Sequence, residues 1–126
     1  MSDNKRYDLV VIGAGPGGYT AAFRASDLGL KVLMIDEDSK IGGVCLNRGC
    51  IPSKALLHVT KVINEVKDLK KMGVSYECKE INIDRLRSWK NSIIKKFNIG
   101  LDTMCKNRLI TFKNGKARFI SDKKIE

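Results

Sequence analysis

The sequence has 126 residues, of which 43% are hydrophobic and 30% charged, with 11 glycines and only 2 prolines. These values are typical of one globular domain and argue against a disordered chain, and no run approaches the roughly 20 apolar residues that a membrane span needs. The net charge of +10 comes from residues 48–126, which carry 19 Lys or Arg against 8 Asp or Glu. Because these charges are dispersed and aromatic residues make up only 6%, we expect a solvated lysine-rich surface, with no nucleic-acid or membrane partner. No basic segment leads into a long apolar one near the N-terminus, so we expect a cytoplasmic protein.

Two apolar runs near the N-terminus flank a glycine-rich turn. Residues 7–13 and 31–36 are rich in β-branched side chains and predict buried strands of a parallel sheet. Residues 19–28 between them have helical composition, and the predicted helix ends at Gly29. A strand, a glycine turn, a helix and a second strand form a βαβ unit, which places the chain in the α/β class.

The rest of the chain predicts two long helices and a hairpin. Residues 53–71 and 84–105 are the expected helices. The first helix carries an apolar stripe at spacings of three and four, formed by Leu56, Val59, Ile63, Val66 and Leu69. The second has an expected buried side formed by Leu86, Trp89, Ile93, Phe97 and Met104. Residues 108–112 and 116–120 flank Asn114-Gly115, a pair that favours a β-hairpin.

The turn after the first strand fits the pattern G-x-G-x-x-G over residues 13–18. In this context of strand, turn and helix, Gly13 permits a tight turn, Gly15 lets the backbone approach a pyrophosphate, and Gly18 allows close packing of the helix. Asp36, at the end of the second strand, is placed to accept hydrogen bonds from ribose hydroxyls. The pattern predicts a dinucleotide site and does not distinguish FAD from NAD.

Cys45 and Cys50 are separated by four residues. With one histidine in the chain and no second close cysteine pair, a metal site is not expected. A disulfide across so short a loop gains little stability, which favours a catalytic dithiol over a structural bond. The helix expected to begin near Ser53 would lower the pKa of a nearby thiol. Two ordinary buried thiols are the alternative, and that is how we interpret Cys78 and Cys105.

Residues 42–54, GGVCLNRGCIPSK, resemble the redox-active disulfide motif of the pyridine nucleotide–disulfide oxidoreductases. The following residues 55–58, ALLH, are similar to the dihydrolipoamide dehydrogenase branch, whereas glutathione and mercuric reductases usually differ around and after Pro52. The resemblance extends from about residue 7 to residue 119. It implies a Rossmann-like FAD-binding domain with a parallel sheet, helices and a small β-hairpin.

The resemblance also implies roles for single residues. Cys45 would be the interchange thiol that reacts with substrate, and Cys50 the thiol beside the flavin. Lys54 would lie near the reactive edge of the flavin, and the backbone of Ala117 would contact the adenine. The remaining implied FAD contacts are Pro16 and Gly43. Two positions depart from the family pattern, because Asp36 stands where Glu is usual and Arg48 where an apolar residue is frequent.

The implied activity is the NAD+-dependent oxidation of dihydrolipoyl groups through the dithiol and FAD. The implied partners are lipoyl-bearing acyltransferases or carrier proteins of 2-oxo acid dehydrogenase or glycine cleavage complexes, and the family forms homodimers. We expect residues 1–126 to be the N-terminal part of an FAD-binding domain, without the NAD-binding and C-terminal domains, and not to turn over alone. His58 is expected on a helix surface rather than in catalysis. A non-catalytic FAD-binding module and a related reductase are the alternatives.

Overall fold

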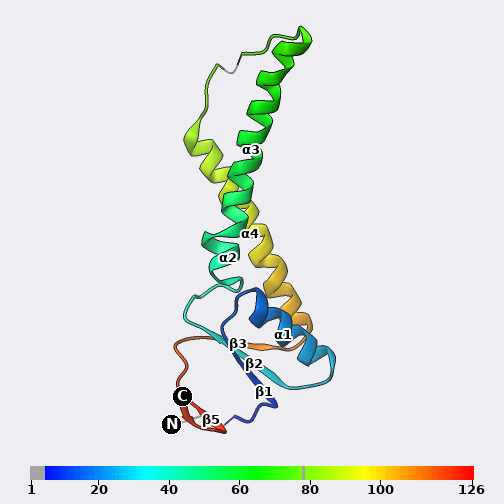
Figure 1. Cartoon of the computed structure of the whole chain (residues 1–126). Helices are drawn as coiled ribbons and strands as arrows, with labels where there is room; N and C mark the ends of the chain where they lie inside the picture. Colours follow the sequence, from blue (N-terminus) through cyan, green and yellow to red (C-terminus); the bar gives the residue numbers. More distant parts are fainter. Residues whose placement is uncertain (1–4, 78) are drawn as a thin grey trace.

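The protein has a sheet-containing body from which a pair of long helices extends (Figure 1). The structure, a computed structural model, describes residues 5–77 and 79–126. The extended pair consists of α3 (Cys50–Asp68) and most of α4 (Ile83–Asn107), joined through a 3₁₀ turn, η1 (Leu69–Met72). Across the described residues, no helix combines the length and apolar content that a membrane span requires.

The body is built on a three-stranded parallel sheet in the order β1 (Leu9–Ile12), β2 (Val32–Asp36), β3 (Thr111–Asn114). Helix α1 (Pro16–Asp27) connects β1 to β2 and packs against both strands. Residues that pair across the sheet point to the same face, so Val11, Met34 and Phe112 share one face. That face forms the core with α1 and the end of α4, and Met34 is fully buried there. The predicted α/β class and βαβ unit are confirmed.

The predicted hairpin around Asn114-Gly115 is wrong. Residues 111–114 form β3, which pairs in parallel with β2, and the antiparallel hairpin lies further on, between β4 (Phe119–Ser121) and β5 (Lys124–Ile125). The physical reason is that the Asn114 side chain donates to the Glu37 carbonyl at 2.8 Å, while the Gly115 N–H donates to the Asp36 carbonyl at 2.8 Å. These bonds fix the Asn-Gly pair to the end of β2 instead of letting it reverse the chain.

The helix predicted from residue 53 begins earlier, at Cys50, and ends at Asp68. A separate six-residue helix, α2 (Gly43–Arg48), precedes it and was not predicted. The two cysteines therefore lie on two different helices. Pro52 is compatible with this because a proline in the first turn of a helix loses no intrahelical hydrogen bond.

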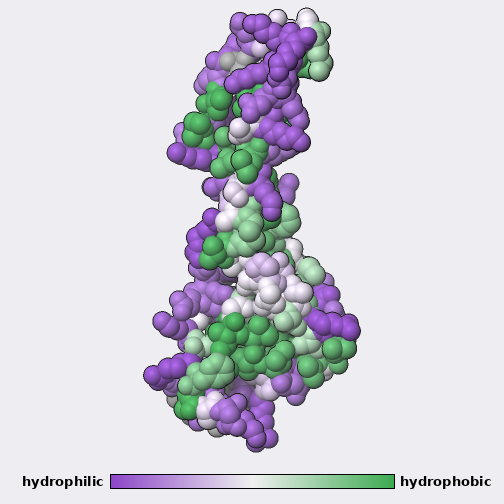
Figure 2. Space-filling model, viewed as in Figure 1, coloured by the Kyte–Doolittle hydropathy of each residue, from purple (hydrophilic) through white to green (hydrophobic). Residues whose placement is uncertain are grey.

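The expected burial of the long helices is only partly correct. No residue of α3 is buried, although four members of its predicted stripe, namely Val59, Ile63, Val66 and Leu69, are half-buried. On α4, Trp89 and Phe97 remain 41% and 49% exposed. Away from the body these helices cover only each other, so one contact face cannot bury a full apolar side. Figure 2 shows the resulting hydrophobic patches along the pair, besides a larger one over the body.

Candidate active site

The glycine loop joins β1 to α1 and is shaped by the chain's own backbone. Gly13 has φ +100° and donates its N–H to the Ile35 carbonyl at 2.7 Å, which ties the turn to β2. A Cβ added at Gly18 would lie 1.8 Å from the Gly13 carbonyl oxygen, so only glycine lets α1 pack here. At Gly15, where φ is −73°, an added Cβ would meet no protein atom within 4 Å. The fold requires glycine at 13 and 18, whereas at 15 the free space suits a close-lying pyrophosphate.

The first turn of α1 adds features that suit an anionic group. Pro16 is at the start of the helix, so the proline takes a position where no intrahelical N–H bond is lost. The free N–H groups and the positive end of the helix dipole at this terminus favour a phosphate. The residues of the loop therefore fit the pyrophosphate of a dinucleotide.

Asp36 lies at the end of β2, beside the glycine loop. Its Oδ2 accepts a hydrogen bond from the Ala14 N–H at 2.5 Å, and its Oδ1 accepts one from the Asp38 N–H at 2.7 Å. Each carboxylate oxygen can accept more than one hydrogen bond, so the group keeps capacity for a ribose hydroxyl. The short aspartate side chain thus contacts the loop backbone directly, while its contact with a ribose stays a prediction.

The segment after β3 runs past the same edge of the sheet. Besides the bonds of Asn114 and Gly115 to the end of β2, the Lys116 ammonium lies 3.9 Å from a Glu37 carboxylate oxygen. Ala117 follows directly and is half-buried in the connection to β4. The structure thus brings the chain leading to Ala117 to the strand end that carries Asp36.

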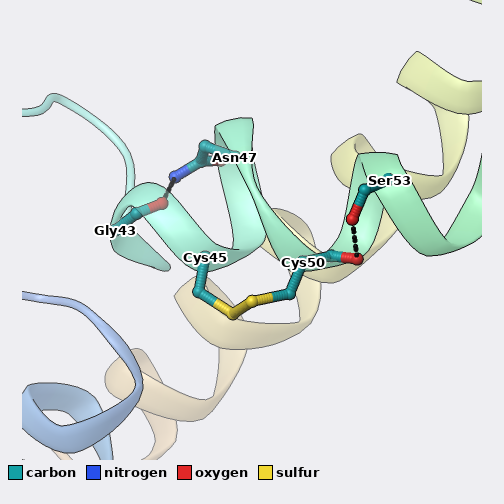
Figure 3. The surroundings of a disulfide bond; sticks show 5 residues. All are labelled: Gly43, Cys45, Asn47, Cys50 and Ser53. Carbon is teal, nitrogen blue, oxygen red and sulfur yellow. Dashed lines mark hydrogen bonds between the residues drawn. A yellow bond between two sulfur atoms is a disulfide. The ribbon is translucent and has the colours of Figure 1, made fainter.

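The two cysteines form a disulfide, as the resemblance implied, with Cα atoms 4.8 Å apart (Figure 3). Cys45 lies on α2 and is half-buried, and Cys50 is the exposed first residue of α3. The Ser53 hydroxyl donates to the Cys50 carbonyl at 3.1 Å within the first turn of α3. Lys54 is exposed one turn beyond Cys50. The dithiol therefore bridges two helices, with one sulfur at a helix N-terminus.

Helix α2, the disulfide-bearing helix that carries Cys45, begins in direct contact with the glycine loop. Gly43 has φ +61°, and a Cβ added there would lie 2.7 Å from the Gly15 Cα. The adjacent Gly42 N–H donates to the Ala14 carbonyl at 2.8 Å. The two predicted motifs, separated by about thirty residues in the sequence, are thus in backbone contact.

Sequence reasoning missed Asn98, a residue of α4 that is only 8% exposed. Its Nδ2 donates to the Ile41 carbonyl at 2.8 Å and to the Asn47 Oδ1 at 3.0 Å. The available signal was an asparagine that lies on α4 at helical spacing between the apolar positions Ile94 and Leu101. A buried amide at such a position must find hydrogen-bond partners, so it indicates a polar contact inside the fold.

Arg48, one of the departures from the family pattern, pairs with an acid next to the site. Its Nη2 and Nη1 donate to the Asp38 carboxylate at 2.7 and 3.2 Å. The positive charge of Arg48 is thus paired with the carboxylate of Asp38, which lies two residues beyond Asp36 in the sequence. An exposed pair of this kind contributes about 0–1 kcal/mol to stability.

The remaining thiols differ from the dithiol. Burial, helped by the Asp102 carboxylate, raises the pKa of Cys105 to about 11, which leaves this thiol protonated and unreactive near neutral pH. Its prediction as an incidental buried thiol agrees with its position in the core. Cys78 lies outside the described residues. His58 is exposed on α3.

The sequence matches known proteins along nearly its whole length. Residues 7–126 match the family described as pyridine nucleotide-disulphide oxidoreductase. The chain is 51% identical to a dihydrolipoyl dehydrogenase of Buchnera aphidicola subsp. Acyrthosiphon pisum over 117 residues, which are 93% of the chain and 25% of the relative. The dihydrolipoyl dehydrogenase of Haemophilus influenzae is 48% identical over 119 residues, 94% of the chain and 25% of the relative. That of Vibrio cholerae is 47% identical over 126 residues, 100% of the chain and 26% of the relative. The chain spans about a quarter of the length of these curated relatives.

Proposed function

The chain belongs to the pyridine nucleotide-disulphide oxidoreductase family, and from this premise we propose that it supplies the FAD-binding and disulfide-bearing part of a dihydrolipoyl dehydrogenase. The observation that carries the proposal is the packing of Gly43, the first residue of the disulfide-bearing helix, on Gly15 of the glycine loop. This contact makes one site of a dinucleotide loop and a redox-active disulfide. A flavin enzyme that exchanges electrons with a dithiol needs that combination.

Four parts of the chain would hold FAD. The glycine loop and the N-terminus of α1, with Pro16, would bind the pyrophosphate, and Asp36 would accept a hydrogen bond from the adenosine ribose. The backbone near Ala117 would lie against the adenine, beside the strand end where Asp36 sits. Lys54 and Cys50, one turn apart on α3, would border the flavin ring, and the exposure of Cys50 leaves room for it. When bound, FAD supplies a two-electron acceptor between the dithiol and NAD+.

The two cysteines would react with the substrate in two successive thiol–disulfide exchanges. A thiolate of the dihydrolipoyl group attacks the Cys45 sulfur, so a mixed disulfide forms and the Cys45–Cys50 bond breaks with Cys50 leaving as a thiolate. The second substrate thiol then attacks the substrate sulfur of the mixed disulfide, and Cys45 leaves and takes up the proton that this thiol releases. The lipoyl disulfide is released, and Cys45 and Cys50 are both reduced. The N-terminus of α3 favours Cys50 as the leaving thiolate.

The wider assignments belong to the same proposal. The substrate would be a dihydrolipoyl group on an acyltransferase or carrier protein, with NAD+ as the final acceptor and a homodimer as the working unit. A reducing compartment such as the cytoplasm suits a disulfide that must open in every cycle. Residues 1–126 would contribute the FAD and dithiol chemistry, and turnover would need the NAD-binding and C-terminal domains of the family.

The test is the Gly15→Ala variant. An alanine at this position meets no protein atom and keeps an ordinary φ, so the fold and the disulfide should be retained. The new methyl group occupies the space proposed for the pyrophosphate, so FAD affinity measured by calorimetry should fall at least tenfold. Gly100→Ala on α4, where an added Cβ is equally free of contacts, is the matched control and should leave affinity unchanged. A Gly15→Ala variant that binds FAD like the unmodified chain would contradict the proposed site.

A further inference from the structure

Two asparagines, the buried Asn98 and the half-buried Asn47, are hydrogen-bonded to each other on the side of α2 that faces away from the disulfide. Figure 3 shows Asn47 on the side of α2 away from Cys45, with its amide turned toward the Gly43 carbonyl. Asn98 of α4 meets it there, donating to the Asn47 Oδ1 at 3.0 Å, and Asn47 in turn donates to the Gly43 carbonyl at 3.0 Å. Asn98 is the one buried polar side chain within the described part of the chain. We call Asn47 and Asn98 the asparagine pair.

The asparagine pair fixes both the entry to α2 and its last turn. The same Asn98 Nδ2 also donates at 2.8 Å to the carbonyl of Ile41, a residue 2% exposed just before the helix. A buried amide without hydrogen-bond partners is unfavourable, so Asn98 stabilises the arrangement of α2 in which both acceptors are in reach. One side chain on the longest helix thereby sets where the disulfide-bearing helix lies.

The other attachments of α2 differ in kind. A six-residue helix has no stability of its own. The Arg48–Asp38 pair is exposed and contributes little. The packing of Gly43 on Gly15 and the burial of Leu46 in the core are contacts without a side-chain hydrogen bond, and the disulfide joins α2 to α3 only while it is oxidised. Once the disulfide opens, the part-buried asparagine pair is the polar attachment that still joins the last turn of α2 to α4.

We propose that Asn98 is a positioning residue that holds α2 against α4 in the reduced state and thereby sets the reduction potential of the Cys45–Cys50 disulfide. The stability of a disulfide depends on how closely its two thiols are held together before the bond forms. With α2 fixed, the Cys45 and Cys50 thiols stay near their bonding geometry, which favours the disulfide. Without the pair, the reduced helix moves more freely and the disulfide is easier to reduce. The inference rests on the proposed function only for the redox role of the two cysteines.

The experiment measures the equilibrium between the chain's dithiol and glutathione, with alkylation and mass spectrometry of the peptides that contain Cys45 and Cys50. Asn98→Leu keeps the size of the side chain and removes its donor. We expect the equilibrium constant for disulfide formation to fall about tenfold, which raises the potential by about 30 mV. Asn91→Leu, an exposed asparagine two turns earlier on the same helix, is the matched control and should match the unmodified chain.

Two further measurements separate positioning from general destabilisation. Asn47→Leu should shift the constant in the same direction, and the double variant should shift it by less than the sum of the two single shifts, because both single changes remove the Asn98–Asn47 hydrogen bond. In concentrated guanidinium chloride all variants should give one common constant. An unchanged constant in an Asn98→Leu chain that circular dichroism shows to be folded would overturn the proposal. If Asn98→Leu does not fold, the half-buried Asn47→Leu decides, and an unchanged constant there overturns it equally.

The measurement needs neither FAD nor a lipoyl substrate. Loss of flavin binding by the unmodified chain would therefore contradict the proposed function and leave the positioning role of Asn98 intact. An equilibrium constant for disulfide formation that is unchanged in the Asn98 and Asn47 variants would contradict the positioning role alone.

Discussion

The body and the helical arm of this molecule are stabilised in different ways. Every residue of the buried core cluster lies in the body, which comprises the sheet, α1, α2, the end of α4 and the segments that connect them. The arm, made of α3, η1 and residues 83–97 of α4, has no buried side chain among its described residues. Near its tip, Met72 and Tyr76 are 76% and 72% exposed. Tertiary packing holds the body, whereas the arm depends on local hydrogen bonds and on the contact between its two helices.

This difference places the candidate site. The glycine loop, Asp36 and α2 all belong to the body, and Cys50 is the residue at which the arm begins. The site therefore lies in the part whose backbone positions are fixed by long-range contacts. Substitutions in the buried core of the body should change both stability and the site, and substitutions in the arm beyond Lys54 should change neither by much.

The largest effect is expected for Gly18→Ala. Its methyl group would overlap the Gly13 carbonyl oxygen, so α1 must move away from the strand that precedes it. We expect a loss of about 4 kcal/mol or more in the free energy of unfolding. Urea denaturation followed by circular dichroism measures it. Gly100→Ala, with no atom near the added methyl, should instead stabilise α4 by up to about 1 kcal/mol. Equal stability of the two variants would remove the steric argument for the glycine loop.

A pair of methionines compares the body with the arm directly. Met34 on β2 is 0% exposed and Met72 in η1 is 76% exposed. Met34→Ala leaves a cavity in the core and should cost about 3 kcal/mol, whereas Met72→Ala should change stability by less than about 0.5 kcal/mol. Urea unfolding curves of the two variants give both values. A cost at Met72 that equals the cost at Met34 would show that the arm tip is buried in solution.

The smallest effect concerns pH and Cys105. Because burial raises the pKa of this thiol from 9.0 to about 11, the folded state favours the protonated form. Its contribution to stability is fully present below pH 9 and is lost as the pH rises toward 11. The difference in unfolding free energy between the unmodified chain and Cys105→Ala should shrink over this interval. A difference that stays constant with pH would contradict the raised pKa.

Local signals in the sequence were enough to predict the βαβ unit and the position of the glycine loop, and the motif around Cys45 and Cys50 was enough to predict their disulfide. The contacts through which Gly13, Gly18 and the Asp36 carboxylate shape the glycine loop are made within the same βαβ unit. The spacing of the motif along the sequence is therefore enough to place these three residues. The parallel pairing of β3 could not be predicted, because the local preference of Asn114-Gly115 for a turn is overridden by hydrogen bonds to the distant end of β2.

The missed part of the site has the same origin. Asn98 is separated from Asn47 by 51 residues, and no pattern in the sequence pairs two asparagines on different helices. Trp89 and Phe97 likewise remain exposed because, in the described part of the chain, no third layer packs against the arm. Their helical spacing alone could not predict this.

The most direct test of the central claim is the visible absorption spectrum of the chain after incubation with FAD and gel filtration, recorded before and after addition of dithiothreitol. We expect a retained flavin spectrum that gains a long-wavelength charge-transfer shoulder on reduction. Cys50→Ser should abolish the shoulder, and Cys45→Ser, which leaves Cys50 as a free thiol, should show it without reductant. If no flavin is retained, or if the Cys50→Ser chain keeps the shoulder, the glycine loop and the dithiol do not form the single redox site proposed for this chain.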